Sequence, residues 1–258
     1  MTCNNRRIVR LLALLLLVVM QGCATERPDP DKQKRDEAIA LYEKHCQQAG
    51  EKIYRTVDHV QGLFLFKLRP KKTNFQDQFV LDDPYGHDTG GDGYIKNFLM
   101  EKKNGSLLDE VGGYGYVDAI DPNDGLRYRY TAYLDQPWLR DKKYAEWVRN
   151  FSLHKELAPN APLPRYGVTY DDISTREDRE HWIAGSSLKV IDLQTHEVMA
   201  ERIGYMVDLG LGSLNGGRSP WLIAAGNACP KFPVVFGTRH PLQQMQARHF
   251  VEKILRIN

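Results

Sequence analysis

Outside its first 20 residues, the chain of 258 residues lacks any long apolar run. The run that it has, residues 11–20, is about half as long as the roughly 20 residues that a helix needs to span a bilayer. Net charge is also small, with 35 lysines and arginines against 33 aspartates and glutamates. A protein so close to neutral lacks the excess of basic residues that is typical of nucleic-acid-binding proteins. Its 26% charged and 42% hydrophobic residues are typical of a globular protein.

The motifs of common enzyme classes are missing as well. Segments 185–187 and 212–214 lack the second glycine of the G-x-S-x-G pattern that exposes a nucleophilic serine. Segment 210–212 fails the dinucleotide-binding pattern because position 215 is Asn. The eight histidines are scattered, and no zinc spacing occurs. We therefore expect a protein with no catalytic residues, no bound metal and no cofactor.

The N-terminus has the pattern of an export signal. Arg6, Arg7 and Arg10 precede the apolar run, and Gly22 and Cys23 follow it. A basic start, a short apolar stretch and a small residue at the cut are typical of a secretory signal that is removed from the mature protein. The sequence thus predicts a signal peptide over residues 1–22, whose removal takes away three arginines and leaves the mature chain near neutral.

The end of this segment resembles the signal of a bacterial lipoprotein, although the residues at positions 20 and 21 depart from the commonest ones. The resemblance implies that Cys23 is lipidated and becomes the first residue, and Ala24 after it favours the periplasmic face of the outer membrane. An ordinary secretory signal with a chance cysteine is the alternative. Residues 23–32 are polar with two prolines and are expected to be a lipidated tether, followed by a single periplasmic domain over 33–258.

Each of the four cysteines can be given an expected role. Cys3 leaves with the signal and Cys23 carries lipid, so Cys46 and Cys229 remain. Two cysteines in an exported chain are expected to pair, because the periplasm is oxidising. The alternative is two separate buried thiols.

The periodicity of apolar residues predicts an α+β fold. Three- and four-residue spacing predicts helices over 31–49 and 241–257. Alternating or β-rich composition predicts the strands 52–57, 62–68, 113–120, 126–134, 181–193 and 197–207, the last two as a hairpin around residues 194–196. We expect a mainly antiparallel sheet with an N-terminal and a C-terminal helix linked by the disulfide.

Two loops stand out as candidate partner-binding surfaces. The first, 82–94, is rich in glycine and carboxylates, and the second, 209–221, contains five glycines or serines before Arg218. Arg and Trp are enriched at binding hot spots, whereas Asp and Gly also dominate ordinary surface turns, and Trp221 could instead pack beneath its loop. The first loop does not match an EF-hand, because positions 90 and 99 are Gly and Leu. The candidate contact residues are Asp82, Asp83, Tyr85, His87, Asp88, Asp92, Arg218 and Trp221.

The mature chain resembles a family of proteobacterial lipoproteins through segments 46–55, 82–86, 91–94, 229–230 and 250–255. Members of this sort are similar to immunity lipoproteins carried beside antibacterial lipases delivered by type VI secretion. The resemblance implies a non-enzymatic binding protein whose partner is a toxin lipase (phospholipase) and which inhibits it sterically. Two other classes stay open: a calcium-dependent envelope hydrolase using Asp83, Asp88 and Asp92, and an envelope scaffold lipoprotein.

Overall fold

The computed structural model describes residues 30–71, 77–86, 89–103, 106–234 and 243–257. The described residues from 34 onward belong to one compact unit, 34–258. The predicted signal peptide and Cys23 lie outside the described residues, as do His87 and Asp88.

Five α-helices and eleven strands lie within the described residues. The helices are α2 (Pro30–Cys46), α3 (Asp92–Leu99), α4 (Arg176–Glu180), α5 (Pro220–Ala224) and α6 (Gln246–Ile254). The strands are β1 (Gly50–Ile53), β2 (Gly62–Leu65), β3 (Met100–Lys103), β4 (Ser106–Val111), β5 (Tyr116–Ile120), β6 (Arg127–Asp135), β7 (Asn150–Leu157), β8 (Tyr166–Asp172), β9 (Ile183–Asp192), β10 (Glu197–Val207) and β11 (Ala228–Cys229). Short 3₁₀ turns are η1 (Pro137–Leu139), η2 (Asn215–Gly217), η3 (Ala225–Asn227) and η4 (Gln243–Met245).

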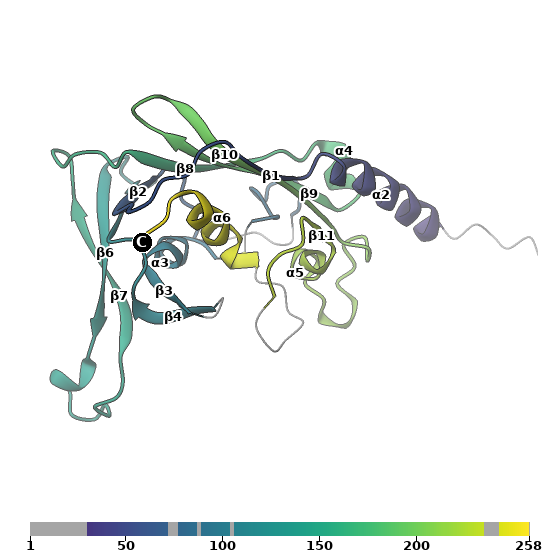
Figure 1. The fold of residues 1–258 in the computed structure, drawn as a ribbon. Helices are drawn as coiled ribbons and strands as arrows, with labels where there is room; N and C mark the ends of the chain where they lie inside the picture. Colours follow the sequence, from purple (N-terminus) through teal and green to yellow (C-terminus); the bar gives the residue numbers. More distant parts are fainter. Residues whose placement is uncertain (1–29, 72–76, 87–88, 104–105, 235–242, 258) are drawn as a thin grey trace, which may run out of the picture. The chain divides into compact units, whose positions relative to one another are not determined.

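One large sheet organises the compact unit. Its strands follow the order β1-β10-β9-β8-β2-β5-β6-β7, and β11 pairs with β10 (Figure 1). The pairs are antiparallel except that β2 runs parallel to both β5 and β8. All four residues of β2 are buried, as expected of a strand between parallel neighbours. The fold is therefore mixed α/β with a mostly antiparallel sheet, which confirms the predicted sheet type.

Most predicted strands are present. β1, β2, β5, β6 and β9 lie within or overlap the predicted ranges, and β10 has the predicted bounds. The expected hairpin turn follows Asp192, whose carboxylate accepts a hydrogen bond from the backbone N–H of Gln194 at 3.0 Å. β3, β4, β7, β8 and β11 were not predicted.

The helices fit the prediction only in part. α2 ends at Cys46 instead of residue 49, and α6 occupies only the middle of the predicted range 241–257, where residues 235–242 lie outside the described part. α3 was not predicted, because its first residue, Asp92, belongs to a segment whose composition is typical of turns. Within the described ranges, no helix is both long and apolar enough to cross a bilayer.

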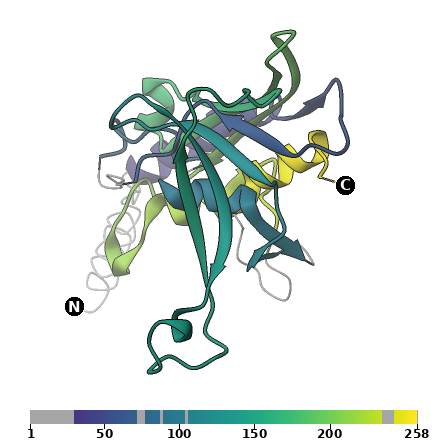
Figure 2. The same ribbon diagram turned by 90° about the vertical axis from the view of Figure 1, so that its left-hand side faces the viewer.

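Two helices cover the main core. α3 contributes Phe98 and α6 contributes Phe250 to the same buried cluster as the central strands. Arg248 of α6 donates hydrogen bonds to the backbone carbonyls of Asn97, at 2.6 Å, and Met100, at 3.3 Å. These bonds hold the two helices side by side (Figures 1 and 2).

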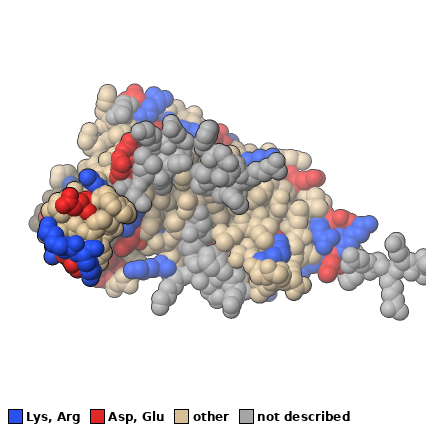
Figure 3. All heavy atoms as spheres, turned by 90° about the horizontal axis from the view of Figure 1, so that it is seen from below, with Lys and Arg blue, Asp and Glu red and all other residues tan. Residues whose placement is uncertain are grey.

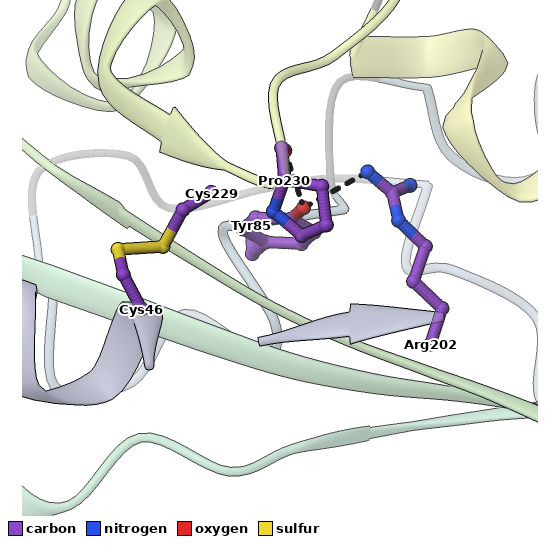
Figure 4. Close-up of a disulfide and its surroundings, with 5 residues drawn as sticks. All are labelled: Cys46, Tyr85, Arg202, Cys229 and Pro230. Carbon is purple, nitrogen blue, oxygen red and sulfur yellow. Dashed lines mark hydrogen bonds between the residues drawn. A yellow bond between two sulfur atoms is a disulfide. The ribbon is translucent and has the colours of Figure 1, made fainter. Parts of the chain in front are cut away.

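The predicted disulfide between Cys46 and Cys229 is present, with the two Cα atoms 5.7 Å apart. It joins the end of α2 to β11, where Cys229 is paired with Tyr205 of β10 (Figure 4). The expectation that it links the two terminal helices needs correction, because β11 precedes α6 and the bridge anchors α2 to the sheet instead. Ala38 of α2 is buried in the same region of the core.

Loss of this disulfide should destabilise the domain strongly. The bridge closes a sequence separation of 183 residues, for which the chain-entropy model gives about 5 kcal/mol. We expect the free energy of unfolding of the double variant Cys46→Ala/Cys229→Ala, measured by urea titration, to be lower than that of the oxidised wild type by roughly this amount. The reduced wild type should match the double variant. Two free thiols per oxidised chain, counted by mass spectrometry, would contradict the pairing.

Candidate functional site

The segment that follows residue 80 is not a free surface loop. Asp83 is buried, and its carboxylate accepts a hydrogen bond from Arg69 Nη1 at 2.9 Å. The backbone N–H of Asp83 donates to Asp172 Oδ2 of β8 at 3.0 Å. A φ of 46° at Asp83 places it in the left-handed region, where the surrounding contacts must hold a residue with a side chain. The predicted contact residue Asp83 therefore anchors its segment to the sheet.

The guanidinium of Arg69 lies among aromatic rings. It is 4.1 Å from the ring centroid of Tyr170 and 5.1 Å from that of Tyr94. Such cation–π contacts stabilise a charge that is removed from water. Burial raises the pKa of Asp83 to about 6, while the positive charge of Arg69 acts in the opposite direction.

A second buried arginine extends this network. Arg179 of α4 pairs with Asp172 through a short contact and donates to the backbone carbonyls of Gln78, at 3.1 Å, and Leu81, at 3.0 Å. The segment 78–83 is thus held from both sides by arginine–aspartate pairs. Removing one member of such a pair leaves an uncompensated buried charge, which costs about 3–5 kcal/mol.

Tyr85 is also buried and belongs to the core. Its hydroxyl accepts a hydrogen bond from Arg202 Nη2 at 3.1 Å and donates one to the carbonyl of Pro230 at 3.4 Å (Figure 4). Gln243 Nε2 donates to the carbonyls of Pro84 and Tyr85, both at 2.7 Å. A Cβ at position 204 would lie 2.1 Å from the Tyr85 hydroxyl, so glycine is required there. Tyr85 joins β10, η4 and the disulfide region, and is not available to a partner.

The remaining acidic candidates of the first loop are on the surface. Asp82 is exposed and accepts a 3.4 Å hydrogen bond from the hydroxyl of Tyr170. Asp92 is exposed in the first turn of α3, where a carboxylate suits the positive end of the helix dipole. Within the described part of the chain, no three His, Cys, Asp or Glu side chains converge to hold a metal ion.

The second loop is folded around Asp208. This buried carboxylate accepts a hydrogen bond from Arg218 Nη2 at 2.6 Å and from the backbone N–H groups of Gly210 and Gly212. A Cβ at Gly210 would lie 2.0 Å from the Arg218 guanidinium, so glycine lets the arginine lie across the backbone. Arg218 is half-buried and serves to order its own loop.

Trp221 on α5 is buried, which agrees with the alternative given above that it packs beneath its loop. Its ring centroid is 5.2 Å from that of Trp182, and the Arg179 guanidinium lies 5.5 Å from it. It shares a buried cluster with Leu81 and Phe232. Of the eight candidate contact residues, Asp83, Tyr85 and Trp221 are therefore buried, and the other described ones are at least partly exposed.

The segment just before the first predicted loop nevertheless packs against the end of the second. Leu81 and Trp221 pack into the same buried cluster, and Arg179 bridges their segments. Each segment has apolar neighbours that point outward and have 43–70% of their surface exposed. We call these residues the α5 patch: Phe79, Val80, Leu214, Leu222 and Ile223. The surface around α5, right of centre in Figure 3, is mostly uncharged.

A second exposed feature was missed by the sequence analysis. β6 and β7 form a long hairpin whose connection, residues 136–149, extends away from the other elements (Figure 2). We call this connection the arm tip. It contains two of the four tryptophans of the chain, and Trp147 is 80% exposed. The density of tryptophan and basic residues over 138–149 is the signal that could have identified it.

Comparisons of the chain with protein-family models, with curated proteins and with solved structures found no match.

The buried position of Asp83 predicts a specific pH dependence. Because its pKa rises from 3.8 to about 6 on folding, the folded state holds this proton more tightly than the unfolded chain does. Its contribution to stability is then fully present below pH 3.8 and is lost as the pH rises through about 6. Relative to Asp83→Asn, the wild type should lose about 3 kcal/mol of unfolding free energy over this window, measured by urea titration.

The matched control is Asp82→Asn, which makes the same chemical change at the exposed neighbouring carboxylate. We expect its pH profile to follow that of the wild type. Parallel profiles for Asp83→Asn and the wild type would show that Asp83 does not titrate in this window.

Proposed function

We propose that this protein is a membrane-anchored envelope lipoprotein that acts as a non-enzymatic binding protein. Its partner is a type VI secreted lipase, and it works as an immunity protein that sterically covers the active-site mouth of that lipase. The observation that carries the proposal is the α5 patch, a group of outward-facing apolar side chains on the segments that border the two predicted contact loops.

The patch has the chemistry of a protein-binding surface. Leu222 and Ile223 are 53% and 43% exposed, although they belong to a helix whose Trp221 and Ala224 are already packed inside. α5 is therefore apolar on both its inner and its outer face, and an exposed apolar patch of this kind marks an interaction site. A lipase must present an apolar entrance to its acyl substrate, and an apolar patch is complementary to such an entrance.

The patch is held rigidly, which favours tight binding. The Arg179 guanidinium fixes the segment that carries Val80, and the disulfide at Cys229 lies on the strand that follows α5 and η3. A surface that is already ordered loses little conformational entropy when a partner binds. Asp83 and Asp208 are buried and Asp172 is partly buried, and each of the three carboxylates is paired with an arginine of the frame.

The membrane address rests on the sequence. Lipidation of Cys23 would place the domain close to the membrane, because the nine residues that follow it reach at most about 30 Å when fully extended. A binder at this position would meet a phospholipase where that enzyme acts.

The proposal predicts that an effector lipase encoded by the neighbouring gene binds the domain tightly and loses activity in proportion to the complex formed. Leu222→Asp and Val80→Asp place charges within the patch, and each should weaken binding by about 30-fold or more, as loss of a hot-spot residue does. Titration calorimetry and a lipase assay at matched concentrations measure the two effects.

The matched control is Leu163→Asp, because Leu163 is 62% exposed but lies in the connection between β7 and β8. It should bind and inhibit like the wild type. Full resistance to the effector in cells that lack the gene would refute the immunity role, and a tight complex with uninhibited lipase would favour an envelope scaffold.

A further inference from the structure

The arm tip is a second exposed surface, with a chemistry unlike that of the α5 patch. Trp147 and Leu139 are 80% and 61% exposed, and Tyr144 is 42% exposed. In the folded chain, these apolar groups contribute little to the core. Exposed aromatic and aliphatic side chains at the end of a two-stranded arm therefore indicate an interaction site, where a partner surface would bury them.

The tip is ordered by its own residues. Arg140 makes two hydrogen bonds to the carboxylate of Asp135, at 2.6 and 2.8 Å, and Lys143 pairs with Asp141 at 2.9 Å. The β6–β7 register continues without a shift from Tyr128 opposite Leu157 to Asp135 opposite Asn150. The arm thus presents a preformed tip rather than a segment that must fold on contact.

Basic side chains alternate with the aromatic ones. Lys142 lies 5.0 Å from the ring centroid of Trp138, and Lys143 lies 5.2 Å from that of Tyr144. Arg140 and Arg149 bring the basic side chains over residues 135–149 to four, against the three carboxylates Asp135, Asp141 and Glu146. The basic groups are visible at lower left in Figure 3, around uncharged surface.

This combination separates two kinds of partner. The cores of protein–protein interfaces are depleted in lysine, even where tryptophan and arginine are enriched. Membrane interfaces, in contrast, combine tryptophan and tyrosine at headgroup depth with lysine and arginine that reach the phosphates. The excess of positive charge suits a bilayer with anionic lipids.

We propose that the arm tip, residues 136–149, is a membrane-contact element that docks on the headgroup region of an anionic phospholipid bilayer. Trp147 and Leu139 enter the interface between headgroups and acyl chains, and the basic side chains, including Lys142 and Arg149, contact lipid phosphates. This contact uses a different surface from the α5 patch and does not depend on the identity of the bound effector.

The test uses a chain that begins at Pro30, which contains the whole compact unit 34–258, its core and its disulfide but no lipid. Vesicles of phosphatidylethanolamine with phosphatidylglycerol are compared with vesicles of phosphatidylcholine alone by co-sedimentation. We expect binding to the anionic vesicles, weaker binding to the neutral ones, and loss of binding at about 0.5 M salt, where electrostatic attraction is screened. Lipids brominated on the acyl chain should quench part of the tryptophan fluorescence.

The double variant Trp147→Ala/Leu139→Ala should reduce vesicle partitioning about tenfold or more. Its melting temperature should stay near that of the wild type, because both side chains are exposed. The control variant Tyr54→Ala/Leu163→Ala removes side chains of similar exposure, 65% and 62%, elsewhere on the surface and should bind vesicles normally. Absence of wild-type binding to anionic vesicles, or equal binding by the tip variant, would overturn the proposal.

Discussion

The buried ion pair between Arg69 and Asp83 is the interaction on which the placement of the segment 78–85 against the sheet depends. Arg69 follows β2, and Asp83 belongs to a segment that would otherwise be a polar loop. Through the backbone of Asp83 the pair reaches Asp172 on β8, and through Asp172 it reaches Arg179 on α4. Charges this deep in a protein are tolerated only when they are paired and hydrogen-bonded, so each contact constrains the next.

The same segment continues into a second set of contacts two residues later. Tyr85 is held by Arg202 of β10, and its carbonyl and that of Pro84 are held by Gln243 of η4. A stretch of fewer than ten residues thus ties together β8, β10 and the turn that precedes α6. The disulfide secures α2 against the same part of β10 (Figure 4). The outward residues of this region, including those of the α5 patch, are therefore displayed on a frame that has little freedom to rearrange.

A feature of this fold could be predicted from the sequence when the residues that determine it are close together along the chain. The β9–β10 hairpin and α2 follow from local periodicity, and the disulfide follows from elimination among four cysteines. The burial of Asp83 does not, because it requires Arg69 and Asp172, which lie 14 and 89 residues away in the sequence and are ordinary charged residues when considered alone. β8 was not predicted either, and its Gly167 is required by a residue distant in the sequence, because a Cβ there would meet the ring of Phe66 at 2.5 Å.

The two exposed surfaces differ in a way that assigns them different partners. The α5 patch is apolar and lacks lysine, and the arginines beneath it, Arg179 and Arg218, are paired with carboxylates inside the protein. The arm tip places lysines directly against aromatic rings. Desolvating a lysine at a dry protein interface is unfavourable, whereas at a lipid headgroup its ammonium stays hydrated and its aliphatic stem is buried. The position of lysine, more than the amount of apolar surface, therefore distinguishes the surface that suits a protein from the one that suits a membrane.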